Sequence, residues 1–147
     1  MEIDKLTGLE IIRGIINGDI PHPPMAETIP MKFTSAEAGS VVFEVIADER
    51  HTNPLGGVHG GFAATVLDSV TGCAVHTMLE AGRGYGTIDL AVKMLKPVPK
   101  NTVLRAEGKV LSVSKSLGVS EGKLLDDDGR LLAYASCTCM LMRPKSE

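Results

Sequence analysis

The sequence predicts an α+β domain in which a curved antiparallel sheet wraps around one long helix. Three observations lead to this class. Residues 60–80 form the only segment long enough for a helix of about twenty residues. Strand-like runs follow that segment, and the short links between consecutive runs favour an antiparallel meander. A chain of 147 residues suits one domain with a sizeable core, so we expect residues 1–147 to form a single unit.

Residues 1–30 are expected to form a short N-terminal helix and an irregular arm. Apolar residues recur at helical spacing from Leu9 to Ile16, and the following Asn-Gly-Asp is a helix stop signal. Four prolines in residues 20–30 argue against both a helix and a central strand in the arm. The period then changes to two in residues 39–48, which predicts a strand, so one or two strands should precede the long helix.

The long helix should be buried on most sides, because most of its residues are small or apolar. An Asp-Gly pair in the last break after it is typical of a tight hairpin turn. The four strand-like runs that follow the helix are residues 85–95, 102–114, 117–127 and 131–142.

Composition argues against several classes of function. The net charge is −3 and no basic run occurs, which disfavours nucleic-acid binding. No run of eighteen apolar residues is present, so we expect no membrane span, and the N-terminus lacks the pattern of a secretory signal. Cys73, Cys137 and Cys139 lie inside apolar segments, which we interpret as reduced, buried thiols of a cytoplasmic protein. Histidine and cysteine spacing fits no metal site, and we expect no metal or cofactor.

A glycine-rich stretch, "NPLGGVHGG" at residues 53–61, stands just before the long helix. A helix that begins near Gly60 presents free backbone N–H groups and the positive end of its dipole. A thioester carbonyl gains negative charge when it is attacked, so these N–H groups are suited to an oxyanion hole. Gly60 and Gly61 have no Cβ, which lets an acyl group come close. The alternative interpretation is a helix start packed tightly against a strand.

Asp68 is the only acid within the apolar part of this helix. A buried carboxylate without a partner costs several kcal/mol, so it needs hydrogen bonds, solvent or a function. Ionised, it could attack a thioester or deprotonate a water; the alternative is an interfacial aspartate that binds neighbouring backbone. Eight residues of helix separate Asp68 from Gly60 by about 12 Å, so one substrate carbonyl can hardly reach both. Two antiparallel helices could bring Asp68 of one chain opposite Gly60 of another, and we therefore expect the site to need a homodimer.

A longer run around these residues, "HTNPLGGVHGGFAATVLDSVTGCAV", resembles the signature of the PaaI-like hotdog-fold acyl-CoA thioesterases. It contains an asparagine, a glycine-rich loop, His-Gly-Gly and an acid eight residues after the first glycine of that pair. The order of elements from Met31 onward and the run "GYGTIDLAVKMLKPV" are also similar to the family. The resemblance implies a hotdog fold and hydrolysis of acyl-CoA to a free acid and CoA. It also implies Asp68 as the catalytic carboxylate and paired subunits that often join into a homotetramer.

Three further residues become site candidates through this resemblance. Asn53 could orient a water or a loop carbonyl, or be only a turn residue before Pro54. His59 could fix the loop, bind the thioester oxygen or shuttle a proton, or cap the loop structurally. Thr87 matches a hydroxyl residue that helps to position water in similar enzymes, although it could be an ordinary β-branched strand residue.

The acyl and CoA subsites are expected on the helix, the neighbouring strands and the strand ends. Lys115, in a loop with several serines, is our candidate for the CoA phosphates, although Lys96, Arg83 and Arg130 are also available. The acyl group, the choice between CoA and a carrier-protein thiol, and the choice between nucleophile and general base stay open. The residues expected to line the acyl pocket are Gly61, Phe62, Ala63, Val66 and Leu90.

Two other functions compete with thioester hydrolysis. A dehydratase or hydratase of acyl thioesters would use a loop histidine and a helix acid, and here His59 and Asp68 are nine residues apart. The His-Phe-Pro loop usual in fatty-acid dehydratases is absent from this sequence. A non-catalytic acyl-CoA-binding module is the third possibility, and the presence of Asp68 argues against it.

Overall fold

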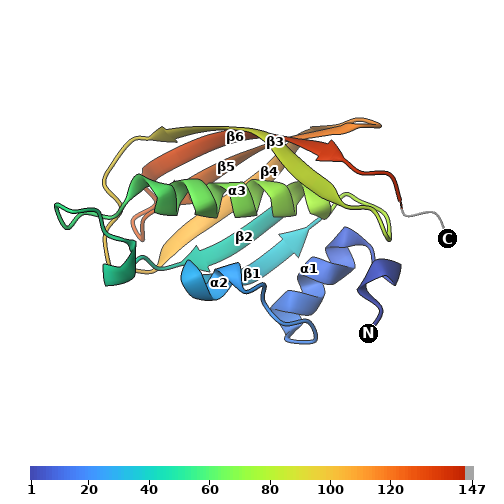
Figure 1. Cartoon of the computed structure of the whole chain (residues 1–147), viewed down its shortest axis with the longest axis horizontal. Helices are drawn as coiled ribbons and strands as arrows, with labels where there is room; N and C mark the ends of the chain where they lie inside the picture. Colours follow the sequence, from blue (N-terminus) through green and yellow to red (C-terminus); the bar gives the residue numbers. More distant parts are fainter. Residues whose placement is uncertain (145–147) are drawn as a thin grey trace.

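A computed structural model describes residues 1–144 of the chain (Figure 1). The elements are a 3₁₀ helix at Ile3–Lys5, α1 at Gly8–Asn17, α2 at Met25–Thr28, β1 at Met31–Glu37, β2 at Ser40–Val45, a second 3₁₀ helix at Glu49–His51, α3 at Gly60–His76, β3 at Tyr85–Met94, β4 at Leu104–Val113, β5 at Leu117–Leu125 and β6 at Leu131–Leu141. Within these residues no helix is both long and apolar enough to cross a bilayer.

The sheet has six antiparallel strands in the order β1-β2-β4-β5-β6-β3. It curves around α3, while α1 and α2 lie beside β1 (Figure 1). This arrangement confirms the predicted class, a curved antiparallel sheet around one long helix with a short N-terminal helix. The sheet begins and ends with β1 and β3, so both are edge strands.

The strand order and two elements differ from the sequence-based expectation. The first strand after the long helix, β3, pairs with β6 and not with β4, so the last four strands do not form a simple meander. The long helix ends at His76 instead of residue 80, because the chain tightens there: the Met78 amide donates to the Val75 carbonyl and the Leu79 amide to the His76 carbonyl. The arm, expected to contain no helix, forms the short α2 directly after Pro24. Proline is tolerated at the start of a helix, since the first amides have no intrahelical acceptor.

The core lies between α3 and the concave face of the sheet. Val66, Leu67 and Val70 on the helix are fully buried, and on the sheet side Phe33 stacks on Phe43 with ring centroids 4.0 Å apart. Gly108 on β4 allows this close packing, because a Cβ there would lie only 2.2 Å from the Val70 carbonyl oxygen. Cys137 and Cys139 are buried free thiols, as expected, and Cys73 is half-buried.

Candidate functional site

The loop before α3 is ordered by Asn53. Its side-chain Oδ1 accepts hydrogen bonds from the amides of Leu55 (3.0 Å) and Gly57 (3.2 Å). The Asn53 amide donates to the Gly57 carbonyl at 2.7 Å, which closes the turn. Within one protomer Asn53 therefore acts as a turn residue, and its hydrogen bonds hold the glycine-rich loop in place just before α3.

His59 is the N-cap residue of α3, and its Nδ1 accepts the Gly61 amide at 2.8 Å. In the tautomer whose Nδ1 accepts a hydrogen bond, the proton is on Nε2. His59 lines a cavity of about 610 Å³ together with Gly61 and Phe62. Gly60 begins the helix, and its amide has no hydrogen-bond acceptor among the described residues. The start of α3 thus offers two donors, the Gly60 amide and His59 Nε2–H.

Asp68 lies two turns further along α3, in a different cavity of about 230 Å³. Its Oδ1 is buried and has no hydrogen-bond partner in the described part of the chain. Thr87 on β3 lines the same cavity, so the structure brings these two predicted residues together. A buried carboxylate oxygen without a donor is costly, which marks this position as a candidate functional site.

Two other titratable side chains, Cys73 and Tyr85, line the Asp68 cavity. Burial raises the pKa of the Cys73 thiol to about 12. Burial also raises the pKa of the Tyr85 phenol well above its ordinary value. Both groups are therefore protonated near neutral pH, and Asp68 is the group in this cavity with the chemistry of a base or carboxylate nucleophile.

The predicted residues are distributed over three cavities within one protomer. Asp68 and Thr87 share the 230 Å³ cavity, while His59 and Gly61 line the 610 Å³ cavity. Gly60 lines a third cavity of about 300 Å³, and Ala63 lines it too. None of these three cavities contains both Gly60 and Asp68.

The expected acyl-pocket residues do not form one pocket. Phe62 lines the cavity beside His59, but Val66 is fully buried in the core and Leu90 is half-buried against it. Neither Val66 nor Leu90 lines a cavity described above. Lys115 is exposed beside Arg83 in a further cavity of about 640 Å³. The Arg83 guanidinium donates a hydrogen bond to the backbone carbonyl of Lys115.

Sequence reasoning missed most of the walls of the Asp68 cavity. They come from the arm, β1, α3 and β3, which are brought together only because both edges of the curved sheet approach α3. No local pattern in the sequence marks these positions, since each looks like an ordinary arm, helix or strand residue. The missed residues are Pro23, Met25, Met31, Phe33, Ser69, Cys73 and Tyr85.

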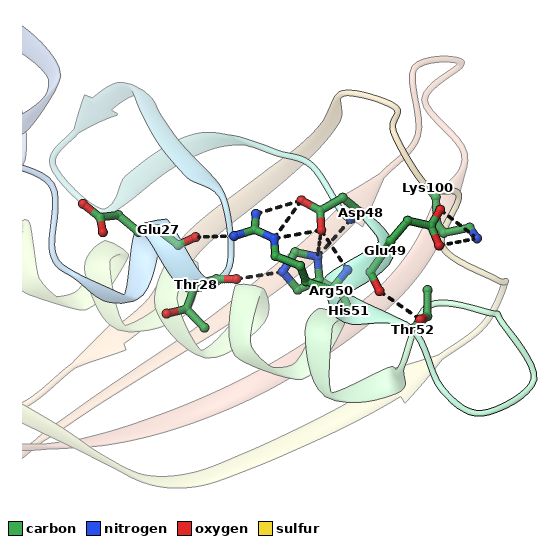
Figure 2. A network of polar contacts seen from close by, with 8 residues as sticks. All are labelled: Glu27, Thr28, Asp48, Glu49, Arg50, His51, Thr52 and Lys100. Carbon is green, nitrogen blue, oxygen red and sulfur yellow. Dashed lines mark hydrogen bonds and ion pairs between the residues drawn. The ribbon is translucent and has the colours of Figure 1, made fainter.

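A polar network joins the arm to the segment before α3 (Figure 2). His51 Nε2–H donates to the Thr28 carbonyl at 2.7 Å, while its Nδ1 accepts the Asp48 amide at 2.9 Å. Arg50 binds the Asp48 carboxylate, with Nη2 2.7 Å from Oδ2, and donates to the Glu27 carbonyl. The hydrogen bonds from Arg50 hold the pKa of Asp48 well below its ordinary value, so this carboxylate stays ionised.

Comparison with known proteins adds to this geometry. The model of the thioesterase superfamily matches residues 55–133, which include the loop, α3 and most of the sheet. The chain belongs to the thioesterase superfamily. This membership confirms the predicted fold family and the predicted enzyme class, a thioester hydrolase.

Individual relatives of this thioesterase agree with the family. Human acyl-coenzyme A thioesterase 13 is 29% identical over 105 residues, which cover 71% of this chain and 74% of that protein. An esterase of Caenorhabditis elegans is 29% identical over 113 residues, or 76% of this chain but only 64% of that protein. The crystal structure of a phenylacetic acid degradation-related protein from Ralstonia eutropha JMP134 is 30% identical, with a TM-score of 0.81. The matched region covers 88% of this chain and 98% of the Ralstonia protein.

Proposed function

We propose that this thioesterase hydrolyses acyl-CoA, with Asp68 as the nucleophile or general base. The observation that carries the proposal is the buried, unpartnered Oδ1 of Asp68 in a cavity that also holds Thr87. A carboxylate without donors keeps its basicity for a water or its lone pairs for a carbonyl carbon. Thr87 supplies a hydroxyl beside it that can orient the water. Similarity to human acyl-coenzyme A thioesterase 13 supports acyl-CoA as the substrate.

The second half of the proposed site is the start of α3. The Gly60 amide stands at the positive end of the helix dipole and has no acceptor among the described residues, so it suits the oxygen of an attacked thioester. His59 and Asn53 would act through the loop: His59 caps the helix and Asn53 closes the preceding turn. Lys115 is kept as a candidate for the CoA phosphates because it is exposed and lies beside Arg83 and Arg143.

We infer that the two halves meet across a homodimer. Small or polar residues form a partly exposed stripe along α3, which would let a second α3 pack closely in the antiparallel direction. Beside it, the outer edge of β3 is unpaired within the described protomer, and Ile88, Met94 and Leu95 are exposed there. Pairing of two copies along this edge would cover these apolar side chains. The stripe consists of Gly61, Ala64, Thr65, Asp68, Ser69, Cys73 and His76.

The predicted tetramer has weaker support, from the convex face of the sheet. Leu117 on β5 and Met140 on β6 are exposed there, and the two residues are paired in the sheet. An exposed apolar patch of this kind marks an interaction surface, which a second dimer could cover. The cytoplasmic location stays a prediction that rests on the free cysteines.

Thiol release from acyl-CoA tests the proposed activity. The purified protein is incubated with a panel of straight-chain and aromatic acyl-CoA substrates, and free CoA thiol is measured over time. We expect release of CoA and of the free acid in equal amounts. A change in enoyl absorbance without thiol release would indicate a dehydratase instead, and tight acyl-CoA binding without either reaction would indicate a binding module.

Complementation between two inactive chains tests the shared site. Gly60→Pro removes the proposed oxyanion donor and Asp68→Asn removes the carboxylate, so each homodimer should be inactive. In a mixed dimer, the intact Gly60 of one chain faces the intact Asp68 of the other, and one of the two sites works. Random pairing of equal amounts should recover about a quarter of the wild-type kcat per chain. Differently tagged chains that pair but stay as inactive as their parents would contradict a site shared between subunits.

A further inference from the structure

The Asp68 cavity continues away from the carboxylate into an apolar compartment. Phe33 from β1 and Tyr85 from β3 line it from the two edges of the sheet, and Cys73 lines it from α3. The cavity volume is about 230 Å³. That space holds about eight non-hydrogen atoms, taking roughly 30 Å³ for each water-sized group. The compartment thus begins at the proposed reacting group and has the size of a compact acyl group.

The outer wall of this compartment comes from the N-terminal arm. Pro23 and Met25 line the cavity although they lie more than forty residues from Asp68 in the sequence. Met25 begins α2 and is 51% exposed, so its side chain has the cavity on one side and solvent on the other. The flexible thioether side chain of Met25 therefore forms part of the wall between the compartment and solvent.

Hydrogen bonds anchor the arm on both sides of Met25. On its N-terminal side, His22 Nε2 accepts the Phe33 amide at 3.3 Å, and the two rings meet edge to face with centroids 5.2 Å apart. On its C-terminal side, His51 binds the Thr28 carbonyl at 2.7 Å and Arg50 binds the Glu27 carbonyl at 3.4 Å (Figure 2). The wall is thus tied to β1 on the N-terminal side of Met25 and to the segment before α3 on its C-terminal side.

We propose that the arm sets the upper size limit of the acyl group, with Met25 as the specificity-determining residue and His51 as a positioning residue. The proposal rests on the proposed function, in which Asp68 acts on the thioester. The substrate class it assigns is a compact acyl group of up to about eight non-hydrogen atoms, in place of a long fatty acyl chain. The thioester carbonyl would lie at Asp68 and the end of the acyl group at Met25.

Substitutions at Met25 test this limit in opposite directions. We expect Met25→Ala to raise the ratio of kcat/KM for dodecanoyl-CoA over hexanoyl-CoA about tenfold, and Met25→Trp to lower it, because a hydrophobic pocket discriminates by the space it offers. Met78→Ala is the matched control, since Met78 is similarly exposed (46%) but lines no part of this cavity. Unchanged ratios in both Met25 variants, or an equal shift in the Met78 variant, would overturn the proposal.

Binding separates a failure of this proposal from a failure of the proposed function. If the wild-type protein releases no thiol from any acyl-CoA, the proposed function fails. The size limit can still be measured as the Kd of non-hydrolysable acyl-CoA thioethers of increasing chain length, by calorimetry. We expect affinity to fall beyond about eight acyl atoms in the wild-type protein, and the fall to move to longer chains in Met25→Ala. Affinities that do not depend on chain length, or the same limit in both proteins, would reject the arm as the wall.

The positioning role of His51 is tested by its effect on selectivity. His51→Phe keeps a ring of similar size but loses both the bond to Thr28 and the bond from Asp48. We expect the released arm to favour dodecanoyl-CoA over hexanoyl-CoA, in the same direction as Met25→Ala, and residues 23–28 to exchange amide hydrogens faster. His51→Gln keeps a donor and an acceptor and should restore most of the selectivity. An equal loss of kcat/KM on every substrate, with unchanged exchange, would show a structural role alone.

Discussion

Asp68→Asn is expected to lower kcat for acyl-CoA hydrolysis by about 10²- to 10⁴-fold, the usual contribution of a general base or nucleophile. The amide has nearly the same shape as the carboxylate but cannot take a proton from water or attack a carbonyl carbon. KM should change little, because the compartment beside residue 68 keeps its volume. Steady-state thiol release over a range of substrate concentrations measures both constants.

The stability of the same variant separates a functional aspartate from a structural one. Asp68 Oδ1 is buried without a donor in the described residues, so the native protein bears a desolvation cost at this position. Asparagine removes the charge, and the thermal unfolding midpoint should stay the same or rise. Asp19→Asn, at an exposed position outside the cavities described, is the control. It should change neither kcat nor the thermal unfolding midpoint. A stable Asp68→Asn dimer with near wild-type kcat would exclude Asp68 from the mechanism.

The fold could be predicted from the sequence because its elements carry strong periodic signals. The period-two runs and the short breaks of the second half predict antiparallel strands, and residues 60–80 can form only one buried helix. The pairing of β3 with β6 instead of β4 could not be predicted, because it depends on how the chain crosses between the sheet edges. The exact end of that helix could not be predicted, since the tight turns after His76 depend on packing: the Leu79 carbonyl accepts the amide of Gly8 in α1. Similarly, α2 follows two prolines whose helix-starting role is only visible in context.

The candidate catalytic residues could also be predicted from the sequence, whereas the residues that form the cavity walls could not. Gly60 and Asp68 stand out because each breaks a local rule: glycine at a helix start, and a carboxylate on a buried helix. Val66 was expected in the acyl pocket because it lies near Asp68 in the sequence, but it faces the sheet and is fully buried. Pocket walls combine residues distant in sequence, such as Met25 and Tyr85, and no single segment encodes them.

Gly60→Pro is expected to lower kcat by about 10²- to 10³-fold, the usual cost of losing one oxyanion-hole donor. Gly60 is the first residue of α3, a position where proline is well tolerated because its amide has no intrahelical acceptor. His59 has φ −62° and ψ 135°, an extended conformation that suits a residue before proline. The substitution should therefore remove one N–H group without unwinding the helix.

Gly60→Ala is the matched control, because it adds a Cβ at the same place and keeps the amide hydrogen. In both variants that Cβ lies about where Met94 Sδ now approaches to 2.6 Å, and this flexible side chain has to move. A loss shared equally by proline and alanine would assign the effect to that steric contact and not to the donor. A large loss in proline alone, with circular dichroism and dimer mass unchanged, would identify the Gly60 amide as the group that receives the charge of the transition state. Because this donor and Asp68 line different cavities in one protomer, the same result would support catalysis by paired subunits.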